Sequence, residues 1–389
     1  MDKTKPLPST TRDARPGKRP SPAPKFTLDV VLATLSKTVF QPFIACLLPL
    51  ALRALASPYT STSFIVTAAF AATVCVYHIL TAIDERLAYG VPREVDWENE
   101  VVIITGGCGG LGGCIAEIYG LRGVSVAVLD VATAEQDDGQ ESEGVYYYRC
   151  DVAELEQIEE VWKRVEEDLG PPTILINNAA LTSFGKISGL KADMVRKTFD
   201  VNTVSHFMTV RLFLAGLGNQ RGGTIVTISS VLGRLGAANL AAYCASKAAL
   251  TTYHHTLAIE LAASAQRVKT ILVAPGQLDT QMFAYAKVQG RLQNFMGPVL
   301  PAGELAMEIV RMIDAGKGGE IKMPAFATWA DIITALPMSL QKGLRWWSGM
   351  DQALDHSTPE FECPDERKVV PLPSVGSNDD SISSEEDSE

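Results

Sequence analysis

The chain has 389 residues, of which 47% are hydrophobic and 20% are charged, and its formal net charge at pH 7 is −11. This length suits one large α/β domain with additional segments, or two small domains. A slightly positive mean hydropathy of +0.10 excludes a wholly disordered chain. The negative charge argues against nucleic acid as the main partner, because the chain has no basic surplus with which to neutralise phosphates.

The charge is concentrated at the two ends of the chain. Residues 1–25 hold seven basic and two acidic side chains, whereas residues 351–389 hold twelve acidic and two basic ones. Segments with such compositions bury too little apolar surface to fold. We expect a disordered basic tail over residues 1–25 and a disordered acidic tail over residues 351–389.

Seven cysteines are scattered along the chain, and none of them belongs to a Cys-x-x-Cys pair. An odd number without metal-ligand spacing supports neither a disulfide framework nor a zinc site. We therefore predict free thiols in a reducing compartment, and no metal.

Residues 26–92 have the composition of a membrane-associated segment. Residues 64–83 carry no formally charged side chain, and 20 helical residues span about 30 Å, the thickness of a bilayer core. The stretch is rich in Ala and Thr, so a buried core helix is the alternative. A second apolar run over residues 39–52 contains Pro42 and Pro49. Its length favours a re-entrant or interfacial helix.

The membrane topology depends on how many of these segments insert. The basic residues before the first apolar run predict a cytosolic N-terminus. If both runs form a hairpin, the remaining chain returns to the cytosol, and if only residues 64–83 span, it lies in the lumen. We favour the hairpin.

From residue 101, short apolar runs alternate with helical stretches. Runs without polar alternation are typical of parallel strands buried on both faces. The expected strands cover residues 101–105, 125–130, 145–150, 173–176, 224–229, 269–274 and 320–323, and the main helices residues 154–169, 191–217, 243–263 and 303–314. This alternation predicts a doubly wound parallel sheet, the Rossmann fold, over residues 93–325, with ligands at the carboxyl ends of its strands.

The first of these strands ends in a glycine-rich turn that opens a helix. Gly106, Gly110 and Gly112 lie in this turn together with Leu111. Glycines let the backbone turn tightly and approach a pyrophosphate closely, and the helix N-terminus then offers free N–H groups to that anion. A strand before the turn and a helix after it predict a dinucleotide site.

Asp130 ends the second strand, 20 residues after Gly110. A carboxylate there can accept hydrogen bonds from the adenosine ribose and would repel a 2′-phosphate. The sequence therefore favours NAD over NADP as the cofactor. The alternative is that Asp130 is an ordinary turn residue at a strand end.

Tyr243 and Lys247 are four residues apart at the start of a predicted helix, which puts both side chains on one face. An ammonium group beside the phenol, together with an oxidised nicotinamide, would lower the tyrosine pKa and make it a proton donor and acceptor. Ser230 follows a strand, where its hydroxyl could bind a substrate carbonyl oxygen. Asn202, a candidate catalytic residue, falls within a predicted helix, and the alternative is a solvated or packed helix residue. Asn178, a candidate cofactor-binding residue, follows the fourth strand, where turn formation is the alternative.

Taken together, these residues resemble the short-chain dehydrogenase/reductase family over about residues 98–325. The resemblance implies that Tyr243 is the general acid/base, that Lys247 lowers its pKa and holds the nicotinamide ribose, and that Ser230 orients the reacting oxygen. Asn202 would hold a water that links Lys247 to solvent.

The same resemblance extends to the cofactor site. Asp151 and Val152 would flank the adenine, and Leu278 and Thr280 would contact the carboxamide. Ala180 departs from the family pattern, which has glycine there, so this turn has to tolerate a Cβ.

The apolar N-terminus, the acidic end of the second strand and residues 320–324 resemble the membrane-associated subgroup that includes retinol dehydrogenases and 17-beta-hydroxysteroid dehydrogenases. This implies a lipophilic alcohol or carbonyl substrate of retinoid, steroid or long-chain type, a membrane of the endoplasmic reticulum or lipid droplet, a cytosol-facing catalytic domain and a homodimer. The rival hypotheses are a catalytically inactive, cofactor-binding membrane scaffold and a soluble dehydrogenase of a small secondary alcohol.

Two segments are candidates for contact with substrate or membrane. Residues 278–300 follow the sixth strand, and their apolar side chains would line the substrate site or pack as a helix pair; these are Met282, Phe283, Tyr285, Phe295 and Met296. Residues 326–350 carry three tryptophans and two basic residues. Such an amphipathic segment suits a membrane interface, and equally a cap on the domain or a dimer contact.

Overall fold

The computed structural model of the chain describes residues 26–133, 138–142, 144–217, 222–264, 267–283, 290–349 and 351. The tail expected over residues 1–25, and the tail expected over residues 351–389 apart from Asp351, lie outside these residues.

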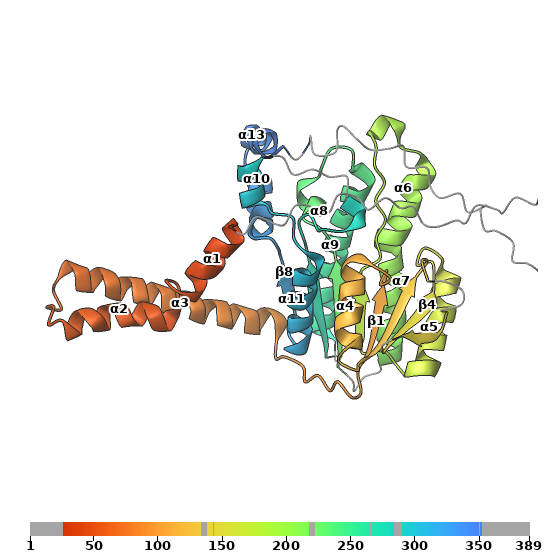
Figure 1. Cartoon of the computed structure of the whole chain (residues 1–389), viewed down its shortest axis with the longest axis horizontal. Helices are drawn as coiled ribbons and strands as arrows, with labels where there is room; N and C mark the ends of the chain where they lie inside the picture. Colours follow the sequence, from red (N-terminus) through yellow and green to blue (C-terminus); the bar gives the residue numbers. More distant parts are fainter. Residues whose placement is uncertain are drawn as a thin grey trace, which may run out of the picture. The chain divides into compact units, whose positions relative to one another are not determined.

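The core of the fold is a twisted sheet whose described strands number eight, in the order β3-β4-β2-β1-β5-β6-β7-β8 (Figure 1). The strands are β1 (Val101–Thr105), β2 (Ser125–Asp130), β3 (Gln140–Ser142), β4 (Val145–Arg149), β5 (Ile174–Asn177), β6 (Gly223–Ile228), β7 (Val268–Val273) and β8 (Gly319–Ile321). All neighbours are parallel except β3, which pairs antiparallel with β4. The predicted doubly wound sheet is confirmed.

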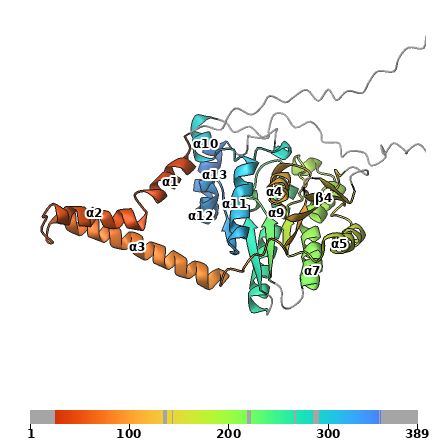
Figure 2. The same cartoon turned by 60° about the horizontal axis from the view of Figure 1, so that its bottom comes forward.

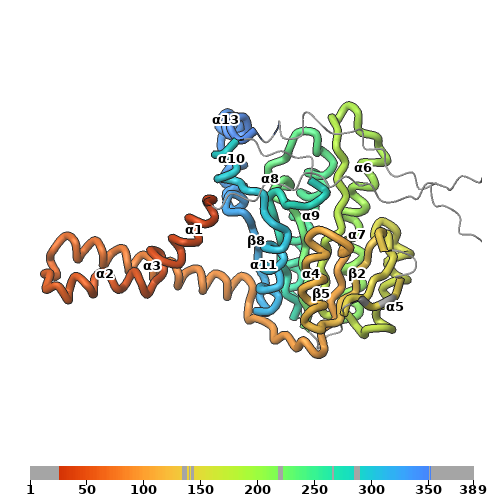
Figure 3. The backbone as a smooth tube through the Cα atoms, viewed as in Figure 1, coloured from red at the N-terminus to blue at the C-terminus, as the bar shows by residue number. Residues whose placement is uncertain are grey.

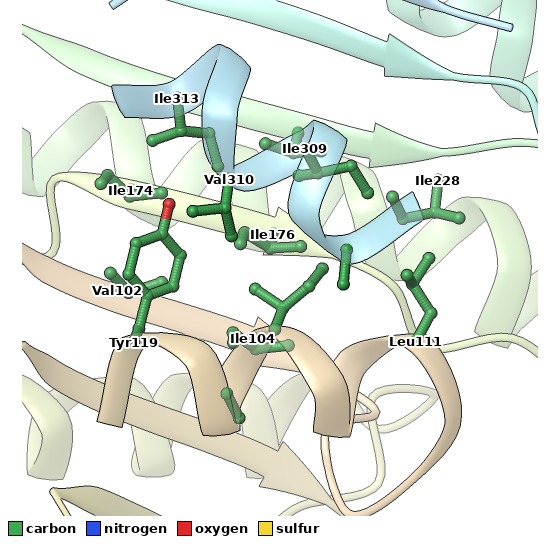
Figure 4. Close-up of a cluster of buried hydrophobic side chains, with 14 of the residues drawn as sticks. Val102, Ile104, Leu111, Tyr119, Ile174, Ile176, Ile228, Ile309, Val310 and Ile313 are labelled. Atoms are coloured by element: carbon green, nitrogen blue, oxygen red, sulfur yellow. The ribbon is translucent and has the colours of Figure 1, made fainter. Parts of the chain in front are cut away.

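Helices cover both faces of the sheet, because successive strand residues point to opposite sides. Ile104 belongs to the core under one helical layer, and its neighbour Ile103 belongs to the core under the other. The first layer consists of α4 (Gly110–Gly120) and α11 (Ala302–Asp314), and the second of α5 (Leu155–Leu169), α7 (Ser205–Leu217) and α9 (Ala241–Ala263) (Figure 2). Figure 4 shows Leu111 of α4 and Ile309 of α11 facing the same strands.

The helix expected over residues 191–217 is interrupted. It occurs as α6 (Ala192–Phe199), a single π-helical turn η3 (Asp200–Val204) and α7. Short additional elements complete the chain: η2 (Ile187–Gly189), α8 (Leu232–Leu235), η4 (Gln281–Phe283), α10 (Arg291–Met296), η5 (Ala325–Trp329), α12 (Ala330–Ala335) and α13 (Met338–Ser348). The last three correspond to the amphipathic segment expected after residue 325.

The N-terminal segment forms three helices, α1 (Leu28–Lys37), α2 (Pro42–Ala54) and α3 (Thr62–Tyr89). Helices α2 and α3 lie side by side (Figure 3), where Ala45 packs against Ala71 and Val74. Among the described helices, α3 alone is long and apolar enough to cross a membrane, while α1 and α2 are bent by 56° and could together count as one broken span. The structure therefore contains the helical hairpin predicted from the two apolar runs, and α2 and α3 form it.

Both ends of this segment return to the α/β domain. At its start, Asp29 accepts a hydrogen bond from the backbone N–H of Ala325 at 2.6 Å. At its end, Lys269 donates to the carbonyl of Tyr89 at 2.6 Å. A hairpin whose two ends contact one domain places both ends on the same side of any membrane that the hairpin enters.

Arg93 fixes the linker between α3 and β1 to the amino-terminal edge of the sheet. Its guanidinium donates to Glu100 at 2.8 Å, to the carbonyl of Gly222 at 2.9 Å and to the hydroxyl of Thr224 at 3.1 Å. Glu100 also accepts a hydrogen bond from Thr173. Because Arg93 and Glu100 are both buried, removing either partner leaves the other without compensation.

We expect Arg93→Met to lower the free energy of unfolding by about 3–5 kcal/mol, because Glu100 stays buried without its cation. The matched control is Arg196→Met, whose ion pair with Asp193 is exposed and whose loss should change stability by less than about 1 kcal/mol. Urea unfolding of the full chain in detergent measures both. Equal effects in the two variants would contradict this role for Arg93.

Candidate active site

The residues singled out in the sequence gather at the carboxyl edge of the sheet. Asp130 is the last residue of β2, Asp151 lies two residues beyond β4, and Asn178 directly follows β5. Ser230 lies two residues beyond β6. In doubly wound sheets this edge carries the ligand site.

The glycine turn between β1 and α4 is packed too tightly for side chains. Gly106 has a φ of +68°, and a Cβ there would lie 2.8 Å from the Cα of Ala179. A Cβ at Gly112 would lie 2.4 Å from the carbonyl oxygen of Gly106 and 2.6 Å from Nδ2 of Asn178. The free N-terminus of α4 therefore stands directly behind a backbone surface without side chains, as a bound pyrophosphate requires.

Asn178 ties this turn to the end of β5. Its amide donates to the carbonyls of Gly106 at 2.7 Å and of Thr105 at 3.1 Å. In return, the hydroxyl of Thr105 accepts from the backbone N–H groups of Asn178 at 3.0 Å and Ala179 at 3.1 Å. Asn178 thus positions the turn, a role that its place after a strand did not reveal.

Ala180, which departs from the family pattern, adopts an ordinary backbone conformation. Among the described residues, the non-glycine residues with positive φ are Ala56 and Asn239. The Cβ of Ala180 therefore causes no backbone strain of this kind.

Asp130 lies against the glycine turn. Its Oδ2 accepts from the N–H of Cys108 at 2.9 Å, and its Oδ1 accepts from the N–H of Ala132 at 2.9 Å. The carboxylate is therefore positioned beside the turn, and it also serves as a turn residue at the strand end. The structure confirms the turn role of Asp130, and the ribose contact expected from the sequence stays a prediction.

The other residues expected at the cofactor lie around the same edge. Thr280 is adjacent to the turn, since a Cβ at Gly110 would lie 3.5 Å from its methyl group. Leu278 forms an isolated bridge with Leu300. Asp151 accepts from the N–H of Ala153 at 2.9 Å, whereas Val152 is buried in the core on the α5 side of the sheet.

Helix α9 begins at Ala241 and carries Tyr243 and Lys247 on its buried face. The Lys247 ammonium nitrogen lies 5.9 Å from the centre of the Tyr243 ring and donates to the carbonyl of Ile228 at 2.7 Å. Ser230 hydrogen-bonds the Tyr243 phenol. The three side chains expected to form the catalytic group are therefore brought together.

The neighbouring serines have different roles. Ser229 is buried beneath α9, where its hydroxyl bonds the carbonyl of Lys247 at 3.1 Å and the hydroxyl of Thr251 at 2.7 Å. Ser230 accepts from the N–H of Leu232 at 3.2 Å and faces the phenol. The spacing of 13 residues to Tyr243 thus selects the serine that faces the phenol.

Burial controls the ionisation of these groups. It raises the pKa of the Tyr243 phenol, and the hydrogen bond from Ser230 opposes this in part. Burial also lowers the pKa of Lys247 to about 7. The lowered tyrosine pKa expected from the sequence assumed an adjacent ammonium and a bound nicotinamide, and in the protein alone desolvation is the largest effect.

Asn202 lies in the π turn η3 and is fully buried. Its side chain accepts from the N–H of Leu181 at 2.7 Å and donates to the Leu181 carbonyl at 2.9 Å and to the Ser246 hydroxyl at 2.9 Å. Ser246 in turn donates to the Tyr243 carbonyl at 2.8 Å. Asn202 is therefore neither solvated nor a simple packing residue. Ser246, for which the sequence pattern predicts no role, connects it to the first turn of α9.

Two histidines are buried behind Lys247. Burial is the main cause that holds the pKa of His206 well below its ordinary value, and Lys247 and His254 lower it further. Burial also lowers the pKa of His254 to about 4. Both imidazoles are therefore neutral near pH 7, and they add no charge beside the lysine.

Apolar side chains surround the buried phenol. Phe283 contacts the Tyr243 ring edge-on, with centroids 5.8 Å apart. Phe184, Leu232 and Leu240 pack in the same cluster, and the sequence alone did not point to them because they come from segments that are far apart along the chain or from short elements. Phe295, expected on this wall, instead stacks on Phe26 at 5.6 Å. Tyr285 lies outside the described residues.

Comparison with known proteins agrees with this geometry. The family model described as short chain dehydrogenase matches residues 100–289. The uncharacterised oxidoreductase TDA5 of Saccharomyces cerevisiae is 30% identical over 264 residues, which are 67% of this chain and 79% of that protein. Retinol dehydrogenase 10-B of Danio rerio is 30% identical over 236 residues, which are 54% of this chain and 70% of that protein.

Solved structures share the fold. The 4-hydroxyisoleucine dehydrogenase complexed with NADH has a TM-score of 0.51 at 23% identity and covers 57% of this chain and 97% of its own. The 3-ketoacyl-(acyl-carrier-protein) reductase from Brucella melitensis complexed with NADH has a TM-score of 0.52 at 20% identity and covers 58% of this chain and 96% of its own. The chain belongs to the short-chain dehydrogenase/reductase family of oxidoreductases, and its relatives include retinol dehydrogenases.

Two neighbouring glycines of α4 test the turn. We expect Gly112→Ala to lower the free energy of unfolding by about 1–3 kcal/mol, because backbone and Asn178 stand where the methyl group would go. We also expect it to abolish NADH binding. Gly113→Ala is the matched control, since its Cβ would come no closer than 3.4 Å to other atoms. Fluorescence titration with NADH and thermal unfolding measure both, and full binding by Gly112→Ala would contradict the role of the turn.

Proposed function

We propose that the protein is an NAD-dependent oxidoreductase that interconverts a lipophilic alcohol and its carbonyl compound at a membrane surface. The observation that carries this proposal is the cluster of Ser230, Tyr243 and Lys247 beside the glycine turn. Bound NAD would supply the hydride acceptor or donor. The protein's own residues would bind and orient the substrate and move its hydroxyl proton.

In this proposal, Tyr243 exchanges a proton with the substrate oxygen, and Ser230 holds that oxygen by a second hydrogen bond. Burial lowers the pKa of Lys247 to about 7, and its protonated form would neutralise negative charge on the phenolate from inside the core. Asn202 fixes the first turn of α9 through Ser246. Its proposed water link to Lys247 follows from the family resemblance.

The residues at the glycine turn fit a dinucleotide. The close packing that excludes a Cβ at Gly106 and Gly112 keeps this part of the turn as bare backbone, which suits a pyrophosphate. Asp130 beside it provides an acceptor for ribose hydroxyls and a charge that repels a 2′-phosphate. This charge supports NAD rather than NADP. The 4-hydroxyisoleucine dehydrogenase and the 3-ketoacyl reductase that share the fold were both solved with NADH.

The apolar surroundings of Tyr243 support a lipophilic substrate. Phe184, Leu232 and Phe283 pack around the phenol, and a retinol would place its alcohol at Tyr243 with its hydrocarbon against such side chains. Retinol dehydrogenase 10-B is among the relatives of this chain.

The N-terminal hairpin supports membrane attachment. Helix α3 has the length and composition of a membrane span, and large apolar side chains such as Val66, Ile79 and Leu80 are exposed on it. Since both ends of the hairpin contact the α/β domain, a cytosolic N-terminus would place that domain in the cytosol too. We propose the endoplasmic reticulum or the lipid droplet as the membrane.

Tyr243→Phe tests the reaction. We expect the variant to lose turnover by about 10²–10⁴-fold, because it lacks the group that transfers the proton, while its NADH binding stays unchanged. The assay follows NADH formation from NAD by the full chain with a panel of retinoid, steroid and long-chain alcohols.

Adjacent serines provide the control for this test. Ser230→Ala should lower turnover by about 10²-fold, whereas Ser229→Ala should keep turnover and lose about 1 kcal/mol of stability. Full activity of Tyr243→Phe would overturn the assignment. Tight NADH binding without turnover of any alcohol by the unmodified chain would favour a non-catalytic scaffold instead.

Asp130→Asn tests the cofactor preference, since it removes the charge and nearly preserves the shape. We expect the ratio of NADPH to NADH affinity to rise by about tenfold, which corresponds to about 1.4 kcal/mol. Asp151→Asn, the same change at the end of β4, should leave the ratio unchanged. The proposal of NAD fails if the unmodified chain binds NADPH as tightly as NADH.

A further inference from the structure

Helix α13 docks on the rest of the protein with its polar side. Gln341 donates to the carbonyl of Leu336 at 2.7 Å, and Arg345 donates to the carbonyl of Leu235 at 2.7 Å. Arg345 is also bonded to Asp351 at 3.0 Å. Gln341 and Arg345 are four residues apart, so they lie on one face of the helix.

The apolar side of α13 is only partly covered by the protein. Leu340, Leu344 and Trp347 are spaced by four and three residues, which makes one continuous stripe. They are exposed by 55%, 39% and 41%, and Trp346 beside them is exposed by 79%. The helix is amphipathic, and its apolar stripe is left partly uncovered, whereas a helix on a water-soluble domain buries that side.

The partly uncovered stripe favours an apolar partner. A surface helix of a soluble domain turns its apolar face to the core, because burial of apolar side chains is the main gain from docking. In α13 the hydrogen bonds of Arg345 to the carbonyls of Leu235 and Gly236 hold the polar side against the domain. Exposed tryptophans on such a helix are typical of the boundary between lipid and water.

The stripe adjoins the membrane hairpin. Helix α10 connects the two, since Gln293 donates to the carbonyl of Trp347 at 3.1 Å and Phe295 stacks on Phe26 just before α1. Figures 1 and 2 both show α10 beside α13 and close to α1. Ile332 of the neighbouring helix α12 is also exposed. Exposed apolar side chains therefore occur on the hairpin and on the C-terminal helices, and α10 lies between the two.

The charge of α13 fits a lipid surface. The helix contains Lys342 and Arg345 and no acidic residue, and Arg291 lies on α10. Exposed cations such as Lys342 are attracted to anionic headgroups. A second copy of the chain would provide an apolar surface but would bring its own cations to the same contact.

We infer that α13 lies on the bilayer surface, with Leu340, Leu344 and Trp347 inserted among the acyl chains. This is a second membrane contact, which builds on the membrane attachment proposed for the hairpin. Because Arg345 also holds the carbonyls of Leu235 and Gly236, in the loop between Ser230 and Tyr243, the contact fixes the rim of the active site against the lipid. A lipophilic substrate could then pass from the bilayer to Tyr243.

Quenching of tryptophan fluorescence by brominated lipids tests this inference on the full chain. The chain is reconstituted into phosphatidylcholine and phosphatidylserine vesicles with brominated acyl chains. We expect Trp347→Phe to lower the fraction of emission that is quenched, because it removes an emitter in contact with lipid. Trp162→Phe is the matched control: Trp162 is buried between α5 and the sheet, so its removal should raise that fraction.

Membrane pelleting after carbonate extraction keeps this result separate from the other proposals. The triple variant, which carries Leu340→Gln, Leu344→Gln and Trp347→Gln, should stay in the pellet, because α3 still anchors it. If the unmodified chain pellets and Trp347→Phe leaves the quenched fraction unchanged, the inference for α13 is wrong while the hairpin proposal stands. If the triple variant instead changes the mass of the solubilised protein, a second copy covers the stripe and the inference is wrong. Absence of alcohol turnover would contradict the proposed function without affecting the quenching.

Discussion

The site depends on a lysine amine that the fold holds inside its core. Lys247 is 1% exposed and its amine donates to the carbonyl of Ile228 at the end of β6. Burial lowers its pKa to about 7, and among the described residues no carboxylate contributes to the shift. A buried cation without a counter-charge is unfavourable. The surrounding contacts therefore have to hold the helix that carries it in place.

The contacts that hold α9 also involve residues next to the catalytic group. Ser229 at the end of β6 bonds the backbone of α9 at Lys247, and Ser246 connects the first turn of α9 to Asn202. Tyr243, on the same helix, is hydrogen-bonded to Ser230. The phenol is buried too, and burial raises its pKa. A positive charge close to the phenol, such as that of an oxidised nicotinamide, would favour its ionised form.

The sequence predicted most of the sheet because the strands are buried on both faces and read as uninterrupted apolar runs. Their ends agree with the structure to within two residues. Strand β3 was missed because Gln140–Ser142 is short and polar. The helix over residues 191–217 was expected to be continuous, and the π turn at Asn202 arises where that side chain bonds Leu181, a contact made by a separate loop. The pattern of α13 indicated an amphipathic helix, but not which face docks, since that depends on the distant carbonyl of Leu235.

The C-terminal helices and the N-terminal hairpin reach the active site through the same short elements. Helix α8, directly after Ser230, is bound to α12 through the ion pair of Arg234 with Asp331 at 2.5 Å. Asp29 binds η5, which precedes α12. A shift of the hairpin or of α13 would therefore act on the loops that position Ser230 and enclose Tyr243. These loops are in contact with helices that carry exposed apolar side chains. Under the proposed membrane attachment, the bilayer that covers those side chains would therefore also support the loops around Tyr243.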